Sequence, residues 1–98
     1  MIKFFKIQGT EIRRAVDVID DHHKTILGYI GQVKELVERN LIFRDNTEGN
    51  MDKWLFISCD AQDIREFRDL ATAKAAVRAG FEPPFPRVVS SFERKDRE

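Results

Sequence analysis

The sequence predicts an α+β domain in which two helices pack on a four-stranded sheet as a two-layer sandwich. Two short segments, Met1–Ile7 and Lys53–Cys59, are rich in residues that favour strands. A long helical pattern follows the first segment, and a shorter one follows the second. The chain has 98 residues, of which 42% are hydrophobic. This composition is sufficient for one buried core and excludes a chain that is disordered throughout. We expect a single domain over residues 1–92.

The first helix is predicted from the strongest apolar pattern in the chain. Met1–Ile7 is the strand before it, Gly9 ends that strand, and Thr10 is a suitable N-cap for a helix over residues 11–39. The pattern repeats at alternating spacings of four and three, with one polar member, and consists of Ile12, Val16, Ile19, His23, Ile26, Ile30, Val33 and Val37. Such a repeat is typical of the contact stripe of a long helix.

The expected length of this helix leads to a prediction about assembly. At 1.5 Å per residue, a helix over residues 11–39 would be about 43 Å long, whereas a compact domain of this size is about 33 Å across. The helix therefore either packs on a second copy of the chain or breaks at Gly28–Gly31, where each glycine costs about 1 kcal/mol relative to alanine. The repeat continues through both glycines, so we predict a continuous helix and a homodimer.

The middle of the chain predicts a hairpin and a second helix. Leu41–Asp45 and Lys53–Cys59 flank a polar stretch, which is typical of two strands joined by a loop. Asp60 is the expected N-cap of a helix over residues 61–79, and Gly80 is the expected left-handed residue at its end.

The last part of the chain predicts a connector, a strand and a tail. Pro83, Pro84 and Pro86 exclude a helix in the connector. Arg87–Phe92 is the expected last strand, and residues 93–98 are a charged, frayed tail.

The order strand, helix, strand, strand, helix, strand resembles the ferredoxin-like βαββαβ topology. In that topology the first and third strands are central and should be the most apolar. Met1–Ile7 and Trp54–Cys59 fit this expectation. The resemblance lies in topology and polarity alone and identifies no protein family.

Charge and cysteine content restrict the class of function. Seventeen basic and seventeen acidic residues cancel, whereas nucleic-acid binders usually carry a basic excess. The one cysteine, Cys59, cannot form an intramolecular disulfide, which fits a reducing compartment. No apolar run approaches the roughly 18 residues of a membrane span. We therefore expect a cytoplasmic protein.

The adjacent histidines His22 and His23 are the first candidate for chemistry. Neighbouring residues on a helix point about 100° apart, so the two rings would not grip one metal ion, and the helical metal-ligand spacing of three or four is absent between them. We interpret His23 as a polar residue within the helix interface, where it fixes the register. A dimer that responds to pH is the alternative, because histidine titrates near pH 6.5.

Cys59 and Arg65 have the C-x5-R spacing of a class of phosphatases, at the end of a strand. That chemistry requires a loop whose backbone N–H groups surround a phosphate. The loop here contains Asp60 and Asp63 and no glycine, and carboxylates would occupy the place of the anion. We therefore interpret Cys59 as a small buried residue before an acidic N-cap.

An aromatic sheet face is the third candidate. Trp54 and Phe56 share one face of their strand, and Phe4 and Phe5 offer one aromatic ring to each face of the first strand. An exposed face of this kind could stack the bases of single-stranded nucleic acid. The segment lacks the glycines of RNA-recognition motifs, so we expect the face to be covered by a second subunit or by the segment "FEPPFP" folded back on it.

These patterns provide no nucleophile–base pair, paired carboxylates or metal cluster, so we predict no catalytic residue, cofactor or metal ion. The leading hypothesis is a small non-catalytic protein-interaction module, a regulator, adaptor or inhibitor of the bacterial or phage accessory type. It would act as a homodimer that binds another protein. The candidate interface residues are Val16, Ile19, His23, Ile26, Ile30, Val33, Val37, Trp54 and Phe56.

Two alternative functions remain open. The first is binding of single-stranded nucleic acid through Trp54 and Phe56, with phosphate contacts from Lys3, Lys6, Lys53, Arg87 and Arg94. The second is an enzyme that uses Cys59 or the histidines His22 and His23.

Overall fold

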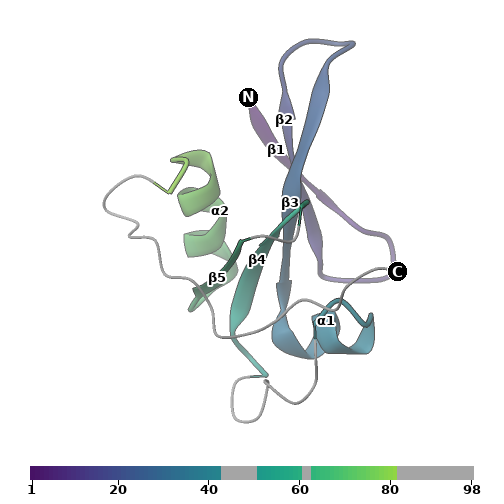
Figure 1. Cartoon of the computed structure of the whole chain (residues 1–98), viewed down its shortest axis with the longest axis vertical. Helices are drawn as coiled ribbons and strands as arrows, with labels where there is room; N and C mark the ends of the chain where they lie inside the picture. Colours follow the sequence, from purple (N-terminus) through teal and green to yellow (C-terminus); the bar gives the residue numbers. More distant parts are fainter. Residues whose placement is uncertain (43–50, 61–62, 82–98) are drawn as a thin grey trace.

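The computed structural model describes residues 1–42, 51–60 and 63–81. Within these ranges, five strands form one antiparallel sheet in which each strand pairs with the next along the chain (Figure 1). The strands are β1 (Ile2–Lys6), β2 (Arg13–Val18), β3 (Lys24–Gln32), β4 (Trp54–Ser58) and β5 (Ile64–Phe67). Two short helices, α1 (Val33–Glu38) and α2 (Leu70–Arg78), pack on the sheet.

The predicted long helix over residues 11–39 is wrong, because most of that segment forms β2 and β3 and only α1 is helical. A spacing of four fits one face of a regular strand as well as of a helix, although the extra residue Leu27 in β3 puts Ile26 and Ile30 on opposite faces. Every spacing of three in the apolar repeat spans the boundary of an element, as Val16 to Ile19 does at the end of β2. The segment is also rich in β-branched residues, which favour strands.

The ferredoxin-like two-layer arrangement is wrong as well, because the helices lie on opposite faces of the sheet. Leu55 and Ile57 of β4 belong to the apolar cluster that includes α1, whereas the intervening Phe56 packs with α2. Within the described residues, β1 is an edge strand rather than a central one, and β3 occupies the middle of the sheet. The strands predicted at Met1–Ile7 and Lys53–Cys59 are themselves confirmed as β1 and β4.

Only the second half of the helix predicted over residues 61–79 is helical. Ile64–Phe67 forms β5, which pairs with β4, so the helix begins nine residues later than predicted, at Leu70 rather than at residue 61. Its N-cap is Asp69, whose carboxylate accepts a hydrogen bond from the backbone N–H of Thr72 at 2.7 Å. Gly80 follows the helix with a φ of +63°, which confirms the predicted left-handed residue.

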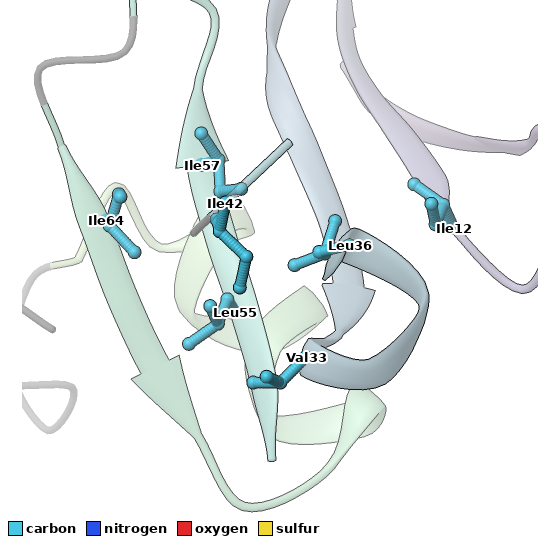
Figure 2. Packing of buried hydrophobic residues seen from close by; sticks show 7 residues of the cluster. All are labelled: Ile12, Val33, Leu36, Ile42, Leu55, Ile57 and Ile64. Atoms are coloured by element: carbon cyan, nitrogen blue, oxygen red, sulfur yellow. The ribbon is translucent and has the colours of Figure 1, made fainter. Parts of the chain in front are cut away.

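Two apolar clusters hold the layers together. The cluster on the α1 side of the sheet consists of Ile12, Val33, Leu36, Ile42, Leu55, Ile57 and Ile64 (Figure 2). The cluster on the α2 side consists of Ala15, Ile30, Phe56, Ala73 and Val77. Alternate residues of β4 point into the two clusters, and for that reason this strand is a continuous apolar run.

Gly28 permits the close approach of β3 to β4. A Cβ atom at this position would lie 2.2 Å from the carbonyl oxygen of Ile57 and 2.8 Å from the ring of Phe56. The register of β2 and β3 shifts beside it, between Ala15 and Val16, so that Leu27 is an extra residue in β3.

Other sequence predictions fall wholly or partly outside the described residues. Leu41 and Ile42 are described, but the rest of the strand predicted at Leu41–Asp45 is not. The connector, the predicted strand Arg87–Phe92 and the tail 93–98 also lie outside. In the described part of the chain, neither helix is long and apolar enough to cross a membrane.

Candidate functional site

The two histidines lie in the loop that joins β2 to β3. The Oδ1 atom of Asp20 accepts hydrogen bonds from the backbone N–H groups of His22 and His23, at 2.7 and 2.9 Å. The Nδ1 atom of His23 lies 2.8 Å from the second carboxylate oxygen. The bond from the His22 amide, followed by that from the His23 ring, holds the pKa of Asp20 below its usual value. This aspartate therefore organises a turn.

His23 is consequently not the polar member of a helix interface, because its side chain is 71% exposed at the end of a hairpin. Among the described residues, no group of three His, Cys, Asp or Glu side chains could hold a metal ion. The ion pair of His23 with Asp20 accounts for the contacts of the ring.

The C-x5-R spacing does not bring its two residues into one anion site. The prediction that Cys59 is buried is wrong, because its side chain is exposed at the end of β4. Its backbone N–H donates to the carbonyl of Leu27 at 3.0 Å. The guanidinium of Arg65 is buried, donates to the carboxylate of Asp63 through Nε at 2.9 Å, and lies 4.0 Å from the ring centroid of Phe81. A carboxylate already neutralises this arginine, so the geometry gives no support to phosphate binding.

The aromatic residues of β4 pack inside the protein. Phe56 is only 4% exposed, and its ring centroid lies 5.3 Å from that of Phe81. Trp54 and Phe67 are partly buried against the same α2 cluster. The expectation of a covered aromatic face is therefore confirmed, and its cover includes α2.

The other predicted interface residues divide into two groups. Ile30 and Val33 have no exposed surface and Val37 is partly buried, so these residues form the core. Ile19 and Ile26, in contrast, are 67% and 41% exposed.

The exposed apolar side chains gather on one part of the molecule. The large hydrophobic residues that are exposed in the described ranges are Met1, Phe5, Ile19 and Ile26. All of them belong to the three-stranded part made by β1, β2 and β3, whose β2–β3 hairpin extends beyond both helices (Figure 1).

Strand register shows which of these residues share a face. Val16 is the Cα partner of Lys3 on one side and of Ile26 on the other, and Arg14 is the partner of Phe5. Because side chains alternate along a strand, these residues share one face with Val18 and its partner Lys24. We call it the ribbon face, and it consists of Lys3, Phe5, Arg14, Val16, Val18, Lys24 and Ile26. It lies on the α1 side of the sheet, since Tyr29, the partner of Arg14, packs against that cluster.

Sequence reasoning identified Val16 and Ile26 but missed the other members of the ribbon face. Phe5 was assigned to base stacking and Lys3 to phosphate contact, while Arg14 and Lys24 fell on the polar side of the supposed helix. The β-branched residues Val16, Val18 and Ile19 are the signal that a strand assignment would have used.

The opposite face of the same strands is covered more fully. Phe4 packs in the α2 cluster, with the guanidinium of Arg78 at 4.9 Å and the ammonium of Lys74 at 5.6 Å from its ring centroid. Cations of the protein itself thus occupy the position that a base would need over this ring.

Comparison with known proteins gives no family for this chain. No family model, no curated protein and no solved structure matches it.

Proposed function

We propose that this protein is a small non-catalytic protein-interaction module whose contact surface is the ribbon face. One observation carries the proposal: Phe5 and Ile26, 48% and 41% exposed, flank the buried Val16 on a single face of the sheet. Contiguous exposed apolar side chains are typical of protein-binding surfaces. In the described part of the chain, the β2–β3 hairpin extends beyond both helices, which leaves Phe5 and Ile26 accessible to a partner (Figure 1).

The chemistry of the described residues favours binding over catalysis. The carboxylate of Asp20 organises a turn, that of Asp69 caps α2, and that of Asp63 pairs with Arg65. Each of these groups has a structural task. A reducing, cytoplasmic location is part of this proposal, because Cys59 is exposed and forms no disulfide. That the chain forms a homodimer stays a prediction, although the helix stripe on which it was based is absent.

The experiment is affinity capture from a lysate of the source organism with the full chain and two variants. The double variant Phe5→Ser/Ile26→Ser removes the apolar groups of the ribbon face. Its matched control is Ile19→Ser, which removes an exposed isoleucine from the hairpin loop. Because all three side chains are exposed, we expect both variants to fold as the wild type does, with unchanged circular dichroism.

We expect one stoichiometric protein to be captured by the wild type and by Ile19→Ser, and to be lost with the double variant. Equal capture by all three chains would show that the ribbon face is not the contact surface. Turnover of a small molecule by the purified chain would refute the non-catalytic part of the proposal.

A further inference from the structure

The ribbon face is cationic although the whole chain is neutral. Its three charged members, Lys3, Arg14 and Lys24, are all exposed. Asp17 of β2 lies on the opposite face, as the partner of Ile2, and Asp20 is bound within the hairpin loop. In the described part of the chain, the ribbon face therefore holds three positive charges and no carboxylate.

The geometry of the sheet indicates the shape of the group that would cover this face. Elsewhere the sheet buries its apolar residues in two clusters, one with α1 on one face and one with α2 on the other. A helix that covers a sheet needs one apolar stripe, and charged residues border that stripe. On the ribbon face, the border residues of such a helix would meet Lys3, Arg14 and Lys24.

We infer that the ribbon face binds an amphipathic helix of a partner protein that carries glutamate or aspartate along its apolar stripe. This inference rests on the proposed function and names the chemistry of the partner. Phe5 and Ile26, the exposed apolar members of the face, contact the apolar stripe, and the three cations pair with the carboxylates that border it. Complementary charge of this kind raises the association rate and selects the partner.

Charge argues against a second copy of the chain and against the chain's own last residues. A second copy in a two-fold arrangement would bring the same three cations against Lys3, Arg14 and Lys24. Residues 82–98 contain four basic and four acidic residues and three prolines, so charge gives them no preference for this face.

Polyanionic partners fit the ribbon face less well than an acidic helix does. Membrane attachment by charge generally uses clusters of about four to eight basic residues, and affinity for nucleic acid grows with the number of neutralised phosphates. The ribbon face has three cations around an apolar centre, a composition closer to that of a protein interface.

The test uses the full chain and three synthetic helical peptides that share one leucine stripe. The peptides carry glutamate, glutamine or lysine at the border positions, and fluorescence anisotropy measures their binding. Three exposed ion pairs contribute about tenfold in affinity, so the glutamate peptide should bind about tenfold more tightly than the glutamine peptide. The difference should largely disappear at about 1 M salt, where the Debye length is about 3 Å.

Charge reversal on the protein supplies the reciprocal test. The double variant Lys3→Glu/Lys24→Glu should lose the preference for the glutamate peptide and gain one for the lysine peptide. The matched control is Arg68→Glu, which reverses a charge that is 86% exposed after β5, at the far edge of the sheet. This control should change the affinity for the glutamate peptide by less than about twofold.

Three results would overturn the inference: equal binding of the three peptides, tighter binding to phosphatidylserine vesicles or an oligonucleotide than to the glutamate peptide, and a dimer on this face that the peptide does not dissociate. If Phe5→Ser/Ile26→Ser loses capture of the partner but the wild type does not prefer the glutamate peptide, the proposed function stands and the inference of an acidic partner helix is refuted. Unchanged capture in that double variant would refute the proposed function itself.

Discussion

Gly28→Ala distinguishes the antiparallel sheet from the long helix. In a helix over residues 11–39, this substitution would stabilise the protein by about 1 kcal/mol, because alanine is the better helix former. In the sheet, the new Cβ atom would lie 2.2 Å from the carbonyl oxygen of Ile57, which belongs to the backbone of β4 and cannot rotate away. The two structures therefore predict changes of opposite sign.

The expected magnitude follows from the contacts of the added methyl group. The atom would also lie 2.8 Å from the Phe56 ring, which is 4% exposed and packed between α2 and Phe81. Such overpacking typically costs about 1–3 kcal/mol, and contact with a backbone atom places Gly28→Ala in the upper half of that range. A loss of about 2 kcal/mol corresponds to a fall in Tm of about 8–16 °C for a domain of this size.

Urea and thermal denaturation, followed by the fluorescence of Trp54, measure the change in the free energy of unfolding. Gly31→Ala is the matched control, because its Cβ would meet only side-chain atoms of Ile12 and Leu36, at 3.0 and 3.1 Å. Those side chains can shift by a few tenths of an ångström, so the loss should be smaller than for Gly28→Ala. A Gly28→Ala protein as stable as the wild type, or more stable, would refute the close strand pairing.

The remaining predictions concern the charged groups. Asp63→Ala should lower the free energy of unfolding by about 3 kcal/mol, because it leaves the guanidinium of Arg65, which is 8% exposed, without a counter-charge. Arg65→Met should cost much less in urea denaturation, since it removes the buried charge and an Nη1 atom that has no hydrogen-bond partner; the reverse order would contradict this account of the pair. The lowered pKa of Asp20 stabilises the hairpin loop above the unfolded value of about 3.9, and this contribution is lost as the pH falls through the lower folded value. Amide exchange at His22 and His23 should therefore accelerate below about pH 4 in the wild type but not in Asp20→Asn, and equal acceleration in both would exclude Asp20 as the titrating group.

Local sequence signals determined several elements of this fold. The apolar, β-forming runs at Met1–Ile7 and Lys53–Cys59 predicted β1 and β4 because strand propensity and turn residues act over a few neighbours. The alanine-rich segment before Gly80 predicted the end of α2 for the same reason, since the left-handed conformation after a helix favours glycine. The expected cover over Trp54 and Phe56 was also correct, because large aromatic side chains next to a strand of isoleucine and leucine rarely remain exposed.

The tertiary structure alone decided how residues 11–32 fold. An apolar spacing of four fits both a helix and a strand, and the choice between them depends on contacts that the segment makes with distant residues. Ile30 is buried because β4 lies beside it and α2 lies above it, and Gly28 is required because Ile57 approaches it. The ribbon face likewise exists only in the paired sheet, since the register of β1, β2 and β3 brings Phe5, Val16 and Ile26 to one face.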